Sequence, residues 1–195
     1  MNNKMKGIPI SMATIVISLA LLHCLAFGSK LPPEKRGVLP EIKIPVPVNA
    51  ADRSYLGLKS IGFFKIPQIK AKVVIIEIFS MYCPHCQREA PEINRIYSII
   101  EDNPDLKGKI KLIGIGAGNS PFEVEVFRKK YNVPFPLFSD EDFSIHKCFG
   151  EVRTPYFLGV KINDYGTHQV FYSKLGEFKG AELFLDLMLQ LSGLK

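Results

Sequence analysis

Cysteine is scarce in this sequence, and its distribution excludes one class of protein. The 195 residues include four cysteines, of which Cys24 lies in an apolar segment near the N-terminus. Cys83 and Cys86 form one close pair, and Cys148 is a single thiol that we interpret as a small buried hydrophobic residue. A fold stapled by disulfides needs more cysteines at wider spacing. We therefore expect no structural disulfide framework.

Clustered positive charge and repeats are also missing. Lys and Arg number 25 against 19 acidic residues, but they form no basic stripe with interleaved aromatic residues. This absence argues against nucleic acid as a partner. The sequence has no internal repeat and no low-complexity tract, and its hydrophobic fraction of 47% fits one ordinary globular core.

A long uninterrupted apolar run occurs only at the N-terminus, over residues 8–22. The run is short for a membrane span, and small residues follow it, so residues 1–28 favour a secretory signal peptide over a retained membrane anchor. Attachment to a membrane through residues 8–27 stays open. A lipid on Cys24 is disfavoured, because His23 precedes it. In either case we expect export to the periplasm or to the outer face of the cytoplasmic membrane.

The rest of the chain divides into a linker and one domain. Residues 29–54 are rich in proline and charge and are expected to form an extended linker along the domain surface. Residues 55–195 form the domain, in which apolar patterns alternate between strand and helix. After one or two short strands around 62–64, the patterns predict strands at 73–79, 109–116, 135–138, 155–162 and 168–172. They predict helices after Cys83 and at 121–132, 141–149 and 181–191.

This order predicts an α/β fold with a central mixed β-sheet and helices on both faces. The first strands alternate with helices and should pair in parallel, whereas the closing hairpin adds antiparallel strands. In the last helix the polar residues Glu182, Asp186 and Gln190 share one narrow face. We therefore expect the rest of that helix to be buried against the sheet.

The strand at 73–79 leads into Cys83-Pro84-His85-Cys86 and then into a helix. Cys83 would stand at the helix N-terminus, where free N–H groups and the helix dipole stabilise a thiolate and lower its pKa. Cys86 is close enough to form a disulfide and to resolve a mixed disulfide between Cys83 and a client protein. Pro84 starts the helix without losing a needed N–H, and His85 can donate to the Cys83 sulfur. Both residues should make the disulfide more oxidising.

Two other interpretations of the cysteine pair are weaker. A zinc site would need a second ligand pair, for which only His146 and Cys148 are available. A purely structural bridge is disfavoured, because a loop of two residues constrains little chain.

The active-site segment resembles a known superfamily. Glu77-Ile78-Phe79-Ser80-Met81-Tyr82-Cys83-Pro84-His85-Cys86 is similar to the corresponding segment of DsbA-type thiol oxidases. The spacing from Cys86 to Thr154-Pro155, with an extra helix and strand between, resembles the TlpA/ResA group of exported thioredoxin-like proteins. The resemblance extends from about residue 72 to the C-terminus.

The resemblance implies a thioredoxin-like fold with an inserted helix–strand unit and thiol–disulfide oxidoreductase activity. It implies client proteins with thiols or disulfides, a redox partner protein that recycles the cysteine pair, no metal, and no cofactor besides the Cys83–Cys86 disulfide. The segment Cys83-Pro84-His85-Cys86 favours an oxidant, whereas the TlpA/ResA-like frame favours a reductant. We lean slightly toward the oxidant, because Pro84 and His85 act directly on the sulfur.

The resemblance also assigns roles to three further residues. Glu77, six residues before Cys83, occupies the place of the family's buried acid, which takes up or passes on the proton of Cys86. An acid in an apolar strand should have a raised pKa, as this role requires. Pro155 occupies the place of the family's cis-proline, and the resemblance implies that the Thr154 backbone pairs with an extended client segment.

Two alternative functions share this fold class. A peroxidase of the peroxiredoxin type carries a threonine three residues before the reactive cysteine, where this chain has Ser80. A copper chaperone is suggested by thiolates beside a histidine, which suit soft metals. Such relatives space their cysteines more widely and add a distant histidine.

Overall fold

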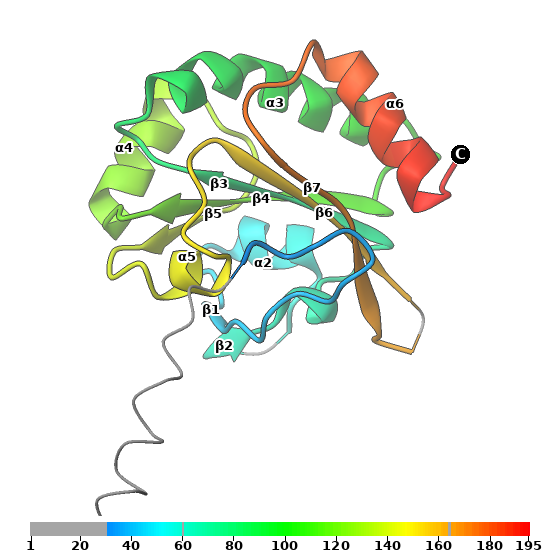
Figure 1. Ribbon diagram of the computed structural model, residues 1–195, viewed down its shortest axis with the longest axis horizontal. Coiled ribbons are helices and arrows are strands. Elements are labelled where there is room, and N and C mark those ends of the chain that lie inside the picture. Colours follow the sequence, from blue (N-terminus) through cyan, green and yellow to red (C-terminus); the bar gives the residue numbers. More distant parts are fainter. Residues whose placement is uncertain (1–30, 60, 164) are drawn as a thin grey trace, which may run out of the picture.

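The centre of the molecule is a five-stranded mixed β-sheet of order β5-β4-β3-β6-β7 (Figure 1). The computed structural model describes residues 31–59, 61–163 and 165–195, so the expectations for residues 1–28 lie outside the described residues. The strands are β3 (Val73–Phe79), β4 (Ile110–Ala117), β5 (Leu137–Asp140), β6 (Tyr156–Ile162) and β7 (His168–Leu175). The first three pair in parallel, and β6 and β7 are antiparallel to their neighbours. The predicted mixed sheet is therefore confirmed.

Helices cover both faces of this sheet, as predicted. One face packs against α3 (Pro84–Asp102), α4 (Pro121–Tyr131) and α6 (Ala181–Ser192). The other face is covered by α2 (Ala50–Leu56), by α5 (Ser144–Cys148) and by the N-terminal segment (Figure 1). Within the described residues, none of the helices is long and apolar enough to cross a membrane.

The continuous apolar run at residues 73–79 forms the central strand β3, as predicted. Its seven residues are all buried, because successive side chains point to opposite faces and both faces are covered. Val74, Ile76 and Ile78 pack on the side of α2 and α5. Val73, Ile75 and Phe79 pack on the side of α3. By the same alternation, Glu77 lies on the α3 side.

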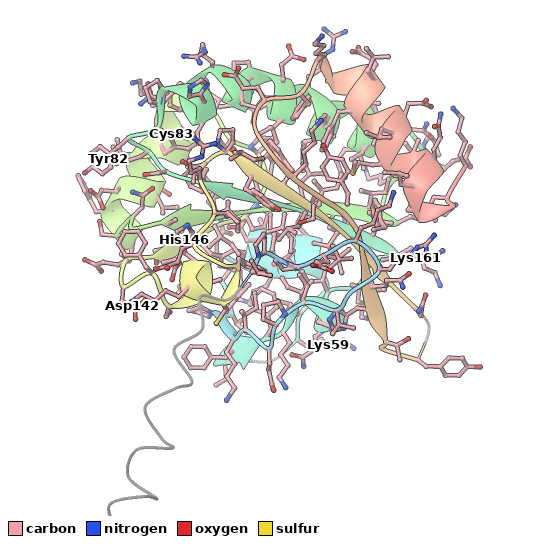
Figure 2. All side chains as sticks on the ribbon, in the orientation of Figure 1. Lys59, Tyr82, Cys83, Asp142, His146 and Lys161 are labelled. Atoms are coloured by element: carbon pink, nitrogen blue, oxygen red, sulfur yellow. The ribbon has the colours of Figure 1, made fainter. Side chains whose placement is uncertain are left out.

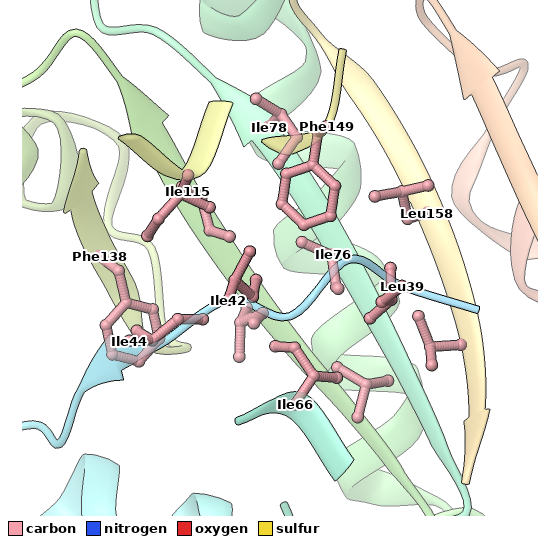
Figure 3. Close-up of a cluster of buried hydrophobic side chains, with 14 of the residues drawn as sticks. Leu39, Ile42, Ile44, Ile66, Ile76, Ile78, Ile115, Phe138, Phe149 and Leu158 are labelled. Atoms are coloured by element: carbon pink, nitrogen blue, oxygen red, sulfur yellow. The ribbon is translucent and has the colours of Figure 1, made fainter. Parts of the chain in front are cut away.

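The expected linker at 29–54 is wrong for its described part, residues 31–54. Leu39, Ile42 and Ile44 have exposed fractions of 6%, 5% and 0% and belong to the core under the sheet. Figure 3 shows these side chains beside Ile76 of β3. The segment also contains β1 (Ile44–Pro45), which pairs with β2 (Phe63–Phe64), and the beginning of α2. Between β2 and β3 lies a short 3-10 helix, η1 (Ile66–Gln68).

The N-terminal segment is buried because the face of the sheet opposite α3 needs a cover. Without residues 39–44 the apolar side chains of β3 and β6 on that face would be exposed to water, at a cost proportional to their area. The prolines of the segment suit an extended chain that crosses a sheet face, because they supply no ladder donor. The expected surface position is thus wrong for Leu39, Ile42 and Ile44.

Smaller differences concern element ends. β5 begins two residues later than predicted, and α5 is shorter than the predicted 141–149. In α6 the expected burial of all residues outside the polar face is wrong, since Leu183 is 71% exposed and Leu187 and Leu191 are 38% and 36% exposed. A helix that lies on a sheet buries one stripe only, here Ala181, Phe184, Leu185, Met188 and Ser192.

Candidate active site

The loop between β3 and α3 is held from both sides. The Met81 N–H donates to Oδ1 of Asn119 over 2.8 Å, and Asn119 is fully buried. The side-chain amide of Gln87 donates to the carbonyl oxygen of Met81, also over 2.8 Å. Residues from the β4–α4 turn and from α3 therefore fix the backbone that precedes Cys83.

Cys83 is the N-cap residue of α3, followed by Pro84 in the first turn, as the sequence predicted. Its Sγ accepts the backbone N–H of Cys86 over 3.4 Å and lies 3.3 Å from the carbonyl oxygen of Thr154. Partial burial raises the pKa of the Cys83 thiol, but hydrogen bonds from the Thr154 side chain and from the backbone N–H groups of Cys86 and His85 outweigh it, so the pKa is lowered. These donors stabilise the thiolate, which is the nucleophilic form.

Cys86 is fully buried and lies one helical turn below Cys83. Burial raises the pKa of its thiol, and the neighbouring charge of Glu77 raises it further. Both cysteines are free thiols in this structure. The pair therefore combines an accessible sulfur with a lowered pKa and a buried sulfur with a raised one.

Glu77 lies in the middle of the sheet, opposite Gly114 of β4 and Phe157 of β6. It is 4% exposed, and its Oε1 has no hydrogen-bond partner among the described residues. Burial raises the pKa of Glu77 to about 8, with smaller contributions from the charges of Glu89 and Cys83. A cavity of about 10 Å³ adjoins Glu77, close to the volume that one water molecule needs.

Glu89 is a second buried acid that the sequence reasoning missed. It is 4% exposed, and its carboxylate accepts the backbone N–H of Phe178 over 3.3 Å. Burial raises the pKa of Glu89 to about 7, although the Phe178 N–H acts in the opposite direction. One signal could have found it: Glu89 stands three residues after Cys86 and so lies on the same face of the helix.

The loop before β6 completes the site. The Thr154–Pro155 peptide bond is cis, as the resemblance implied. The structure thus brings together Cys83, Cys86, Thr154 and Pro155, with Glu77 in the sheet beside them.

His85 faces outward rather than toward the core. Its Nδ1 lies 3.1 Å from Oε1 of Glu177 and 2.7 Å from the guanidinium of Arg88. Arg88 also pairs with Glu177 over 3.0 Å. The loop between β7 and α6 therefore contacts His85, one of the two residues between the cysteines.

The residues considered for a metal site, His146 and Cys148, have other contacts. His146 binds the carbonyl oxygen of Val152 over 2.7 Å, and Cys148 packs partly buried against the core beneath the sheet. Within the described ranges, no three residues of the types His, Cys, Asp and Glu gather as a metal site would require.

Comparisons with known proteins agree with this geometry. The sequence model of the AhpC/TSA family matches residues 52–173. A thiol-disulfide oxidoreductase ResA of Halalkalibacterium halodurans is 24% identical over 102 residues, which are 52% of this chain and 54% of the relative. The chain thus spans about half the length of the curated relative that it matches.

Solved structures share the fold. A putative thiol:disulfide interchange protein DsbE of Chlorobium tepidum superposes with a TM-score of 0.61 at 13% identity, covering 84% of this chain and 99% of that protein. A secreted disulfide oxidoreductase of Mycobacterium tuberculosis superposes with a TM-score of 0.50 at 17% identity, covering 78% and 92%. These likenesses show the thioredoxin-like fold.

Proposed function

The chain belongs to the AhpC/TSA family, and from this premise we propose that it is a thiol–disulfide oxidoreductase acting through Cys83 and Cys86. One observation carries the proposal. Cys83 caps α3 with a thiol of lowered pKa, one turn from a buried Cys86 of raised pKa. Such a pair suits nucleophilic exchange followed by internal resolution.

The exchange proceeds in two balanced steps. In the oxidising direction, a client thiolate attacks Sγ of Cys83 in the Cys83–Cys86 disulfide. The bond between the two cysteines breaks, a bond between client and Cys83 forms, and Cys86 leaves with the electron pair and takes up a proton. A second client thiolate then attacks the client sulfur of the mixed disulfide, and Cys83 leaves as a thiolate. Two electrons have passed from the client to the cysteine pair, and the reverse order reduces a client.

Glu77 and Glu89 are the acids that move the proton of Cys86 in this scheme. The raised pKa of each lies near neutrality, where a carboxyl group can both give and accept a proton. Glu77 influences the Cys86 thiol through its charge.

The residues around Cys83 would contact the client and set the redox potential of the cysteine pair. The Thr154 carbonyl, 3.3 Å from the Cys83 sulfur, is placed to pair with an extended client backbone beside Pro155. The expectation that the His85 side chain donates to the Cys83 sulfur is not met, because the ring contacts Glu177 and Arg88 instead. The proposed preference for an oxidant therefore depends on Pro84 and on the backbone N–H groups of His85 and Cys86.

We place the protein outside the cytoplasm, in the periplasm or at the outer face of the cytoplasmic membrane, with residues 1–28 as signal peptide or anchor. The similar Mycobacterium tuberculosis protein is described as secreted, which supports this placement. The cysteine disulfide is the redox group, without a further cofactor, and a separate redox protein recycles it.

The proposal is tested with the oxidised full-length chain and a reduced model protein that has two cysteines. The wild-type chain should oxidise the model protein, as counted by alkylation and mass spectrometry. Cys83→Ser should abolish the reaction, because it removes the attacked sulfur. Cys86→Ala, with Cys83 reduced and the model protein supplied in its disulfide form, should instead accumulate protein linked to the client, because no Cys86 thiolate is present to resolve the mixed disulfide.

Cys148→Ser provides the matched control, since this thiol packs against the core away from the pair. It should retain the wild-type rate. A Cys83→Ser chain that still exchanges disulfides at that rate would refute the assignment.

A further inference from the structure

A groove of about 430 Å³ lies beside Cys83. Tyr82, the residue before Cys83, forms one side, and Phe143 and Arg153 contribute from the segment between β5 and β6. Thr154, whose carbonyl lies 3.3 Å from the Cys83 sulfur, is also part of the lining. Figure 2 shows Tyr82 and Cys83 on one side of the molecule, with Lys59 at the opposite side. A client attached to Cys83 would therefore pass this groove.

Two aromatic rings are held at the groove although much of each is exposed. Tyr82 is 65% exposed, and its hydroxyl donates to Glu123 of α4. Phe143 is 43% exposed and has a φ of +59°, a conformation that is uncommon for a bulky residue. Its ring lies against Gly118, where an added Cβ would come within 2.3 Å of the ring. Phe143 is thus kept at the surface by an uncommon backbone conformation and by the space that Gly118 leaves. Exposed aromatic rings that are fixed in this way are typical of a binding surface.

The charge available in the groove is positive. Its basic lining residues are His146 and Arg153, and His146 is already bonded to the carbonyl oxygen of Val152. The Arg153 side chain is exposed and makes no hydrogen bond or ion pair with any residue that the structure describes. A free guanidinium next to aromatic rings is complemented by a carboxylate.

We propose that the clients of this protein carry an aromatic side chain and an acidic side chain within about two residues of the reactive cysteine, bound by Tyr82 and Phe143 and by Arg153. The inference rests on the proposed function, because the client cysteine at Cys83 sets the position of its neighbours. Arg153 directly precedes Thr154. In a client segment that pairs with the Thr154 backbone, a residue one position along the strand, about 3.3 Å away, would therefore lie beside Arg153.

The test measures how fast single-cysteine peptides reduce the oxidised full-length chain. A first peptide thiol opens the Cys83–Cys86 disulfide, and a second releases the peptide disulfide, so that excess peptide leaves the protein dithiol. Four peptides place Phe or Ala, and Glu or Lys, beside the cysteine. The Phe peptides should react about tenfold faster than the Ala peptides, and the Glu peptides about threefold faster than the Lys peptides.

Variants separate the two contacts. Phe143→Ala should remove the preference for Phe, and Arg153→Glu should reverse the preference for Glu over Lys. Lys59→Glu makes the same charge change far from the groove and should alter neither preference. Because Arg153 and Lys59 are both exposed, these two variants test the charge contact even where Phe143→Ala disturbs the fold.

Dithiothreitol, which has no side chains to bind, distinguishes this inference from the proposed function. If dithiothreitol and every peptide fail to reduce Cys83–Cys86, the proposed function fails. If all reduce it but the four peptides react equally, or Arg153→Glu leaves the preference unchanged, the groove assignment is overturned. A dimer in solution that Phe143→Ala dissociates would also overturn it, by assigning the groove to a second copy.

Discussion

Glu77 is a carboxyl group in the middle of a sheet with one oxygen lacking any partner among the described residues. Burial raises its pKa to about 8 from the ordinary 4.5, helped by the charges of Glu89 and Cys83. Between these two values the folded chain holds a proton on Glu77 that the unfolded chain has released. Stability must therefore fall as the pH rises through this window.

Glu77→Gln should remove that pH dependence. The variant should gain stability over the wild type as the pH rises from 4.5 to 8, by up to about 1.4 kcal/mol per pH unit. It should also slow disulfide exchange at neutral pH by about tenfold or more, because Gln cannot carry the proton of Cys86. Urea unfolding and exchange assays across this pH range check both effects.

The exposed Glu34 gives a matched control, since Glu34→Gln removes a carboxylate that lies in water. It should change neither quantity. A Glu77→Gln chain whose stability follows the wild type at every pH would contradict a buried, protonated Glu77.

At this scale the sequence predicted the place of the cysteine pair, between a buried strand and a helix, and the resemblance pointed to Glu77 as a buried acid, which the structure shows it to be. Glu89 was missed, since a glutamate in a helix is ordinary until its face is known to be buried. Arg153 and Phe143 were not predicted as residues near Cys83, because only the fold brings together residues 70 and 60 positions apart.

The burial of the N-terminal segment, residues 31–54, could not be predicted from the hydrophobic pattern of the sequence. β3 is buried on both faces, and so its residues form an unbroken apolar run that any reading of the sequence finds. Residues 31–54 instead place single apolar side chains between prolines and charges. Their burial depends on a sheet face that closes over them, which is a tertiary effect. The exposed leucines of α6 were missed for the same reason.

Ile44→Ala should destabilise the protein, because this side chain is 0% exposed in the core under the sheet. A buried Ile→Ala change costs about 2–5 kcal/mol. Val48→Ala changes a residue of the same segment that is 95% exposed, and it should alter stability by less than about 0.5 kcal/mol. Denaturant unfolding of both variants measures these changes. Equal losses in the free energy of unfolding would contradict a core position for Ile44 and would support a surface linker.

In the whole molecule, the two sheet faces have separate tasks. The face under the N-terminal segment and α5 holds an apolar core, with Cys148 packed against it. The face under α3 holds Cys86 and the two buried acids, and the Phe178 N–H bonded to Glu89 links them to the β7–α6 loop. The proposed redox site is thus built where the sheet, one long helix and one loop meet, while the opposite face holds a separate apolar core.

The direction of electron flow is a property of the whole molecule, because it depends on the free-energy difference between the dithiol form and the disulfide form of the folded chain. Donors to the Cys83 sulfur stabilise the thiolate and so favour the dithiol. We predict a pair more oxidising than thioredoxin, whose potential is about −270 mV.

The most direct measurement is equilibration of the full-length chain with glutathione buffers of graded ratio, followed by alkylation and mass spectrometry of each cysteine. The account predicts that Cys83 and Cys86 lose and regain their thiols together, in one two-electron transition at a potential above about −270 mV, while Cys148 stays a thiol. Cys83 and Cys86 that remain unpaired across the whole range, or that change independently of each other, would contradict it.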